Sequence, residues 1–260
     1  MDDVIDALAR DPLRNIVLLK HLEAFPGDTR VHHVRGTAGA ATLVLLSAAA
    51  SAYDRQAYPE VEYSAVISSD HPDLTAGLLP YVPRGVGVVF KLMNDADRDV
   101  VGAAYSLRRA TSFRSFTAET AFTPDERVRI TIRPDEVAFS LFEAQGHARG
   151  WLRSLLESGR AFVAVLERDR NVLAACFAFQ NYGRVWEVGG VCTPAEFRRQ
   201  GHARRVVRTA LAELGRRGLI PRYQVHERNE ASTRLAESIG LKQFLITTHF
   251  IHMPEGRDLA

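Results

Sequence analysis

The second half of the chain alternates between two hydrophobic patterns that together predict a regular series of strands and helices. Short apolar runs closed by Gly, Pro, Asn or Asp are typical of strands, whereas apolar residues three and four positions apart are typical of amphipathic helices. The predicted order, β-α-α-β-β-β-α-β-α-β, indicates an α/β fold with a mixed sheet. The strands are expected at 128–134, 161–167, 172–180, 184–193, 221–227 and 242–253, and the helices at 135–145, 151–159, 201–215 and 230–240.

The first half also has an α/β pattern, but it contains no motif that we can assign. Its helices are expected near 2–9, 12–24, 72–80 and 95–101, and its extended segments near 30–35, 41–49, 63–69, 86–92 and 103–116. The polar stretch 117–127, which includes Pro124, predicts a linker. We therefore expect an N-terminal α/β domain over 1–127 and a second domain over 128–260.

The composition is that of an ordinary globular protein, with 46% apolar and 25% charged residues among 260. The longest apolar stretch, Ala40–Ala52, is shorter than the ~20 residues that a membrane-spanning helix needs. Cys176 and Cys192 lie in apolar runs without metal-ligand spacing. We expect free buried thiols, no metal, no membrane partner and a cytoplasmic location.

Positive charge is concentrated in the second half of the chain. Residues 1–127 carry 13 basic against 17 acidic side chains, and residues 128–260 carry 20 against 14. Seven arginines and two glutamates fall within 195–218, which fits either a solvated helix face or a local anion site. The total charge of +2 and the absence of a basic run interleaved with aromatics argue against a nucleic-acid partner.

The start of the helix at 201 is suited to a phosphate. The first turn of a helix has unpaired backbone N–H groups and the positive end of the helix dipole. Gly201 and Ala203 leave room for phosphate oxygens near the backbone, and Arg198 and Arg199 supply charge. On this segment alone, an arginine-rich helix start without a ligand is an equal interpretation.

Two motifs together resemble the GNAT acyltransferase superfamily. Arg198-x-x-Gly201-x-Ala203 resembles the motif Arg/Gln-x-x-Gly-x-Gly/Ala, which follows the fourth strand of that family and holds the pyrophosphate of coenzyme A. The stretch 229–241, NEASTRLAESIGL, resembles a second motif, whose asparagine contacts the pantetheine arm. The resemblance covers roughly 128–255 and is greatest to the two-domain branch of glycine N-acyltransferase-like proteins.

The resemblance implies a GNAT fold with a mostly antiparallel sheet and acetyl-CoA as cosubstrate, without a metal. It also implies which residues bind the cosubstrate. These are Val191, Cys192, Thr193, Arg198, Arg199, Gln200, Gly201, His202, Ala203, Arg204, Asn229 and Ser232.

Acetyl transfer to an amine needs a base, because an alkyl amine with a pKa of ~10 is mostly protonated at neutral pH. Glu187 is the candidate: it lies on the strand 184–193, and the family places a glutamate base at a similar position. The competing interpretation is an ion pair with Arg184 or Arg222. A backbone N–H near Val191 would polarise the thioester carbonyl. Gly189-Gly190 is the place where a bulge of this strand can begin, and tight packing is the alternative explanation for the paired glycines.

The leaving thiolate is the weak point of the resemblance. Many members place a tyrosine where this chain has Ala236, so we assign no general acid from the sequence. Four routes stay open: a proton from Ser232, from Tyr223 or from a water, or departure of the acidic coenzyme A thiol without assistance. We expect Cys192 to be a packed thiol rather than a nucleophile.

These patterns predict an N-acetyltransferase that moves an acetyl group from acetyl-CoA to a primary amine of a small molecule or peptide. The expected partners are this acceptor and, as an assembly to test, a second copy in a homodimer. The main alternative is a protein of the same fold that binds acetyl-CoA without catalysis. A third hypothesis, a nucleic-acid-binding module, predicts salt-dependent affinity that coenzyme A does not compete away.

Overall fold

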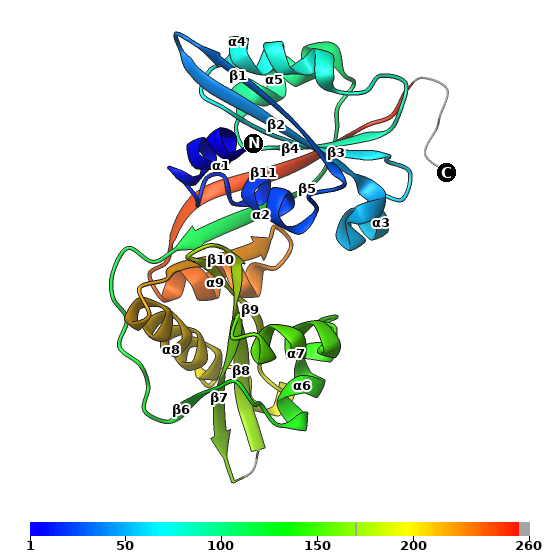
Figure 1. Cartoon of the computed structure of the whole chain (residues 1–260). Helices are drawn as coiled ribbons and strands as arrows, with labels where there is room; N and C mark the ends of the chain where they lie inside the picture. The colour runs from blue at the N-terminus through cyan, green and yellow to red at the C-terminus, as the bar shows by residue number, and fades with distance from the viewer. Residues whose placement is uncertain (170, 255–260) are drawn as a thin grey trace. The chain divides into compact units, whose positions relative to one another are not determined.

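The computed structural model describes residues 1–169 and 171–254, which form two compact units (Figure 1). One unit comprises Met1–Arg114 and Leu245–Ala260, and the other comprises Ser115–Phe244. This division differs from the boundary expected between 127 and 128, because part of the last strand joins the first unit and the segment 115–127 joins the second. The final six residues of the expected domain 128–260 lie outside the described residues.

The second unit is built on the predicted mixed sheet. Its strands pair in the order β6-β7-β8-β9-β10, antiparallel except for the parallel pair β9 and β10, in which Val185 lies opposite Ile220. The strands of this sheet are β6 Val128–Thr131, β7 Ala161–Arg168, β8 Asn171–Tyr182, β9 Val185–Cys192 and β10 Ile220–His226. The helices are α6 Glu136–Glu143, α7 Arg149–Glu157, α8 His202–Arg216 and α9 Glu230–Ser238. The expected fold class is confirmed.

Helices cover both faces of this sheet, with α8 on one side and α6 and α7 on the other (Figure 1). The apolar stripe of α8, which includes Val206, Val207 and Ala210, packs on one set of strand residues. The alternate strand residues, among them Val163 and Phe177, pack against α6 and α7. The two-residue period of the strands therefore supplies two cores, one for each face.

Strand β9 contains a bulge at the paired glycines, the first of the two explanations considered for them. Ala175 lies opposite Cys192 and Phe177 opposite Gly189, so β9 has one more residue than β8 over this stretch. Gly190 has a φ of 59°, and a Cβ on it would overlap the ring of Phe177. Only glycine fits both the backbone conformation and the space at this position.

The first unit has its own mixed sheet, in which the strands pair in the order β1-β2-β3-β4-β11. The pairs are antiparallel except β3 and β4, in which Tyr63 lies opposite Val88. Its strands are β1 Thr29–Gly36, β2 Gly39–Ser47, β3 Tyr63–Ser69, β4 Val88–Leu92 and β5 Arg108–Thr117, with β11 at Lys242–His252. Its helices are α1 Asp2–Ala9, α2 Ile16–Ala24, α3 Ala52–Ala57, α4 Pro72–Leu78 and α5 Asp95–Ala104. Strands β5 and β11 each contribute residues to both units.

The chain repeats one order of elements, with most of one repeat in each unit. If the short helix α3 is set aside, α1 to β5 follow the order α-α-β-β-β-α-β-α-β, and α6 to β11 follow the same order, while β6 lies between the two repeats. In both repeats the successive strand pairs are antiparallel, antiparallel and parallel. Helices α4 and α8 thus occupy equivalent places, as do α5 and α9. Within the described part of the chain, no helix has the length and apolarity to cross a membrane.

Candidate active site

The loop that leads from β9 into α8 has an unusual backbone. Arg199 has a φ of 62° and Gly201 a φ of 77°, both in the left-handed region. Gly201 is the N-cap of α8, and no side chain of the described residues caps that end of the helix. By contrast, Asp135 accepts a hydrogen bond at the start of α6 and Asn229 accepts one at the start of α9. The first amides of α8 are therefore open to a ligand.

A cavity of about 770 Å³ lies at this loop. It is lined by the end of β9, the loop, the first turn of α8 and one side of α9. Ten of the twelve residues predicted to bind the cosubstrate line it, namely Val191, Cys192, Thr193, Arg198, Arg199, Gly201, His202, Ala203, Arg204 and Ser232. Gln200 and Asn229 are not among its lining residues. The structure thus brings the predicted residues together around one space.

Three arginines of this cavity lack an acidic partner within the described residues. Arg198 donates from Nε to the Thr193 carbonyl oxygen at 3.1 Å, and neither Arg199 nor Arg204 forms an ion pair there. Arg205, one position further on, is held by Asp125 at 2.6 Å. The positive charge that borders the cavity is therefore that of the loop and the first turn of α8.

Some polar atoms near this loop have no hydrogen-bond partner among the described residues. These atoms are Thr193 Oγ1 and His202 Nδ1, and both are buried. Burial lowers the pKa of His202, and the charge of Arg205 acts in the same direction. Gln200 directs its amide nitrogen to the Glu196 carbonyl oxygen at 3.4 Å, which explains why it does not line the cavity.

The thiol of Cys192 behaves as expected for a packed side chain. It is 6% exposed, and its Sγ lies 3.4 Å from the Ala175 carbonyl oxygen, to which it donates. Burial raises the pKa of Cys192 to about 12 and that of Cys176 still further, so neither forms a thiolate at neutral pH. Both cysteines are free, as predicted.

A second cavity, of about 510 Å³, lies beside the first and shares Gln145, Val191 and Ser232 with it. Gln145 spans the two cavities by donating from its amide to the Val191 carbonyl oxygen at 3.0 Å. The second cavity is also lined by His147, the bulged part of β9 from Glu187 to Gly190, Tyr223, Gln224 and Asn229.

Glu187 faces this second cavity, and the competing ion pair with Arg222 is present. Its Oε2 accepts from Arg222 Nη1 and from Asn181 Nδ2, the latter at 2.6 Å. The Arg222 side chain is only 3% exposed and also donates to Ser115 Oγ at 3.2 Å. Arg184, the other partner considered, is bound to the Gly218 carbonyl instead. Asn181 was not anticipated, because a single asparagine near a turn carries no signal of a partner six residues away.

The groups considered for protonation of the leaving thiolate meet at the same cavity. Burial raises the pKa of Tyr223 to about 12, and a hydrogen bond with Ser232 acts in the opposite direction. Asn229 Oδ1 accepts from the Ser232 backbone N–H at 3.0 Å and so caps α9. Ala236 is fully buried in the core beneath α9, where it lines neither cavity. Tyr223 is therefore a protonated donor within reach of Ser232.

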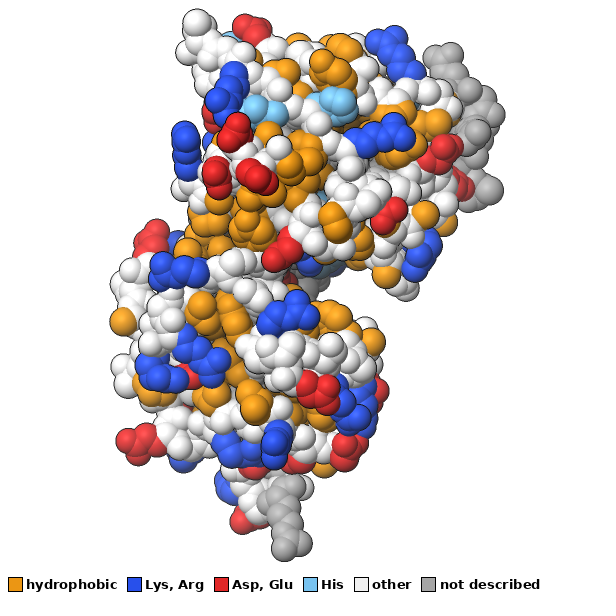
Figure 2. All heavy atoms as spheres, in the orientation of Figure 1, with side chains coloured by type: hydrophobic (Ala, Val, Ile, Leu, Met, Phe, Trp, Pro, Cys, Tyr) orange, Lys and Arg blue, Asp and Glu red, His pale blue; other side chains and the backbone are white. Residues whose placement is uncertain are grey.

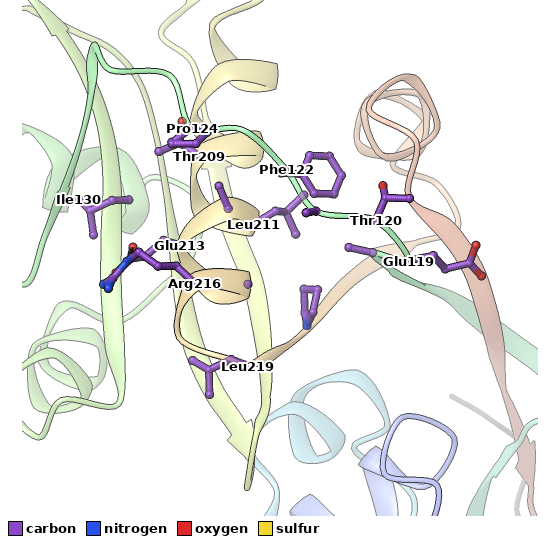
Figure 3. Close-up of a pocket in the computed structure, with 15 residues that line it drawn as sticks. Glu119, Thr120, Phe122, Pro124, Ile130, Thr209, Leu211, Glu213, Arg216 and Leu219 are labelled. Carbon is purple, nitrogen blue, oxygen red and sulfur yellow. Dashed lines mark hydrogen bonds and ion pairs between the residues drawn. The ribbon is translucent and has the colours of Figure 1, made fainter.

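A further cavity of the second unit lies along the segment 118–124 and α8 (Figure 3). Figure 3 shows mainly apolar side chains on its walls, including Phe122, Leu211 and Leu219. Its charged residues on α8, Glu213 and Arg216, are already paired at 2.7 Å. It contains none of the predicted site residues.

One face of the second unit carries basic, acidic and hydrophobic side chains side by side (Figure 2). On the face drawn in Figure 2, its basic side chains are interspersed with hydrophobic and acidic ones and form no continuous band. Several of them are neutralised, as Arg149 is by Glu136 and Glu143. Phosphate-backbone binding needs a clustered basic surface, which this face lacks.

Comparison with known proteins agrees with the geometry. A sequence profile of the acetyltransferase (GNAT) family matches residues 125–241, which therefore form a GNAT acetyltransferase domain. No functionally curated protein matches the chain.

Solved structures agree in fold. The chain is similar to the GCN5-related N-acetyltransferase from Kribbella flavida, with a TM-score of 0.58 and 14% identity over 91% of this chain and 94% of that one. It is also similar to the GCN5-related N-acetyltransferase from Sphaerobacter thermophilus, with a TM-score of 0.57 and 14% identity over 85% and 79%. A Drosophila protein has a TM-score of 0.57 and 13% identity over 98% of both chains. At these identities the likeness concerns the fold alone.

Proposed function

We propose that the GNAT domain of this chain moves an acetyl group from acetyl-CoA to a primary amine of a small molecule or peptide. The observation that carries this proposal is the pair of adjoining cavities. One has open helix amides and three arginines that lack an acidic partner among the described residues, and the other has a carboxylate on a bulged strand. An anionic cosubstrate and a cationic acceptor would meet where the cavities share Val191 and Ser232.

The loop between β9 and α8 would hold the pyrophosphate. Backbone N–H groups at the start of α8 and the positive end of its dipole favour an anion there. Arg198, Arg199 and Arg204 add charge-assisted hydrogen bonds, and Gly201 keeps a side chain out of the way. Asn229 is committed to capping α9 through its oxygen, so its amide nitrogen is the part left for the pantetheine arm.

The bulge in β9 would supply the donor to the thioester carbonyl. It removes Gly190 and Val191 from the regular register with β8, and we take a backbone N–H of these two residues as the donor. A backbone N–H fixed near the reacting carbonyl stabilises the negative charge that develops on its oxygen during attack.

Glu187 would act as the general base, directly or through an intervening group. Its Oε2 is occupied by Arg222 and Asn181, whereas its Oε1 has no hydrogen-bond partner among the described residues. One oxygen therefore fixes the side chain and the other remains for the acceptor. Tyr223, acting through Ser232, would return a proton to the leaving thiolate in place of the tyrosine that Ala236 replaces.

A protein that binds acetyl-CoA without catalysis is the second candidate. Two observations favour it, namely the ion pair of Glu187 with Arg222 and the buried Ala236 at the usual tyrosine position. The ion pair and Ala236 would also fit a branch of the family that catalyses a different reaction. The relation to glycine N-acyltransferase-like proteins and a role of the first unit in acceptor selection are further proposals.

Release of the coenzyme A thiol from acetyl-CoA, measured with a panel of primary amines, separates the two candidates. An enzyme releases thiol faster when the right amine is present, and Glu187→Gln slows this release without weakening coenzyme A binding. A binding protein takes up acetyl-CoA in calorimetry but shows no amine-dependent release in either form.

A further inference from the structure

The loop between α6 and α7 places a histidine, His147, in the wall of the cavity that contains Glu187. The backbone N–H of His147 donates to the Phe142 carbonyl oxygen at 3.1 Å, which fixes the loop against α6. Its ring meets the edge of Phe177 at a centroid distance of 4.9 Å and is stacked beside Trp151 at 6.5 Å. The imidazole is thus held by aromatic rings while its cavity face stays available.

The bulge of β9 supports this arrangement. Phe177 packs so closely on Gly190 that no side chain fits there, and the same ring supports His147. The strand that presents Glu187 and the loop that presents His147 are therefore positioned by one aromatic residue. No pattern in the sequence indicated this, because the two residues are forty positions apart.

The imidazole is suited to accept a proton. Burial lowers the pKa of His147 below its usual value, and the negative charge of Glu187 acts in the opposite direction. At neutral pH the ring is therefore mostly uncharged, and it has a free lone pair. Glu187, by contrast, already has one oxygen engaged with two donors.

We propose that His147 takes the proton from the acceptor's ammonium group in this cavity and that Glu187 stabilises the imidazolium that results. This inference rests on the proposed acetyl transfer and identifies the group through which Glu187 acts. Aromatic rings beside the cavity would also favour an amine that carries an apolar or aromatic body.

The reaction balances with these groups. The ammonium nitrogen gives one proton to His147, which later passes it to solvent. The nitrogen lone pair then forms the C–N bond with the acetyl carbon, and collapse of the tetrahedral intermediate breaks the C–S bond. The nitrogen loses its second proton, which ends on the departing sulfur through Ser232 or Tyr223, so that the products are the acetamide and the coenzyme A thiol.

Other ionisable groups near His147 are few within the described residues. Glu187 on β9 and Tyr223 on β10 line the same cavity. Arg222 of β10 reaches the cavity only through its ion pair with Glu187. Arg149 at the start of α7 is neutralised by Glu136 and Glu143. The charge that bears most directly on the imidazolium is that of Glu187.

Two amines of different basicity test the proposal. Benzylamine is protonated at pH 7 and needs the base, whereas 2,2,2-trifluoroethylamine is largely uncharged and does not need the first proton transfer. We expect His147→Asn to lower kcat/KM for benzylamine about 100-fold or more, since general base catalysis is worth that much, and to lower it far less for trifluoroethylamine. The KM for acetyl-CoA should stay the same, and His147→Gln serves as the second variant should the first fail to fold.

A matched control is His33→Asn, which changes a half-buried histidine of lowered pKa in the first unit. It should leave both reactions as they are. An equal loss for both amines, or no loss for either, in the His147 variants overturns the role of His147 while acetyl transfer itself stands. Absence of transfer by the wild-type protein with both amines overturns the proposed function, and the inference with it.

A titration independent of turnover checks the coupling. In NMR spectra of the labelled full chain, the pKa of His147 should fall in Glu187→Gln, because the charge that favours the imidazolium is removed. The pKa of His33 should not move. An unchanged pKa of His147 would also overturn the proposal.

Discussion

The two units repeat one order of elements, yet the equivalent starts of α8 and α4 have opposite chemistry. Helix α8 begins with Gly201 in a left-handed conformation. Among the residues that the structure describes, no side chain caps this helix, and the arginines beside it have no acidic partner. Helix α4 begins with Pro72, is capped by His71, and has Asp70 and Asp73 beside its first turn. Asp70 also forms an ion pair with Arg14 at 3.2 Å and accepts a hydrogen bond from the Ala40 backbone N–H.

This difference shows that the fold alone does not make the anion site. Both helices follow a strand that is parallel to the next one, and both present a positive dipole end at the same place in the topology. In the first unit that end is capped by a ring nitrogen, and the carboxylates of Asp70 and Asp73 are close to it in the chain, which disfavours a phosphate. In the second unit the loop sequence leaves it open.

The equivalent helices α5 and α9, in contrast, begin with the same kind of cap. Asn94 caps α5 by accepting from the Asp97 backbone N–H at 2.8 Å, as Asn229 caps α9 by accepting from that of Ser232. The asparagine of the second motif thus has a structural reason to be present in both repeats. It is weaker support for a cosubstrate site than the glycine and arginines before α8.

Of the variants that test this comparison, Gly190→Ala is expected to have the largest effect, a loss of stability. Strands β2 and β3 of the first unit pair without a shift of register, whereas β8 and β9 need the bulge at Gly190. An added Cβ would overlap the Phe177 ring in a left-handed backbone, so we expect a loss of about 2–4 kcal/mol in the free energy of unfolding. Urea denaturation measures it.

The neighbouring Gly189→Ala is the control, because a Cβ there meets its nearest atom at an ordinary 3.6 Å. It should cost much less. Equal stability of Gly190→Ala and the wild-type protein would show that β9 is not bulged as described.

The second effect concerns the open helix start. Arg198→Ala combined with Arg199→Ala should weaken coenzyme A binding by about 2–4 kcal/mol, or about 30- to 1000-fold in Kd, because two charge-assisted contacts are lost. Titration calorimetry with coenzyme A gives this directly. The matched control removes the same charge at the other end of α8, by Arg216→Ala with Arg217→Ala, which are both paired with Glu213. Equal affinity of the two double variants would remove the loop from the site.

A smaller effect separates backbone strain from binding. Gly201 and Gly85 have similar φ angles, 77° and 74°, and a Cβ at either meets no atom within 4 Å. Alanine at either position should therefore cost about 1–2 kcal/mol in unfolding free energy through strain alone. Only Gly201→Ala should also reduce coenzyme A affinity, by about tenfold, since its Cβ would lie where the phosphate approaches. Equal coenzyme A affinities in the two variants would contradict the proposed position of the phosphate.

The sequence predicted the local elements well and the non-local relations poorly. Every predicted strand and helix of the second unit is present, because period and turn residues act within a few positions. Helix α3 was missed, since the alanine-rich run before it continues the apolar pattern of β2. The division of the units was not anticipated, because β11 pairs with β4, more than a hundred residues away.

In the candidate site, too, residues that are contiguous in the chain were predicted, whereas residues brought together from separate segments were not. The loop residues of α8 were found because they are contiguous and carry a motif. The residues around Glu187 were not predicted, because Asn181 binds it from the neighbouring strand and His147 lines the same cavity from a separate loop. A single histidine in a predicted turn carries no functional signal in a sequence. His147 becomes a candidate only because it lines the same cavity as Glu187.

The smallest effect contrasts the histidines of the two units. In the first unit, burial and the nearby Lys91 hold the pKa of His21 well below 6.5, and the side chain lies in the interior. The unfolded chain therefore binds a proton below pH 6.5 that the folded chain does not, so stability falls as the pH drops through that value. In the second unit, His147 and His202 also have lowered pKa values but line cavities, so their protonation should act on activity and binding as well.

We expect His21→Phe to remove about 1 kcal/mol of the decrease in unfolding free energy between pH 7.5 and 5.5, since one pH unit of unequal proton binding is worth ~1.4 kcal/mol. Urea denaturation at the two pH values, with wild type and variant in parallel, isolates this histidine from the others. Because the change removes a ring nitrogen that has no partner among the described residues, the variant should be no less stable at pH 7.5. An equal pH dependence in the two proteins would mean that His21 takes up its proton in the folded state, and the first unit would then tolerate a buried charge that its packing disfavours.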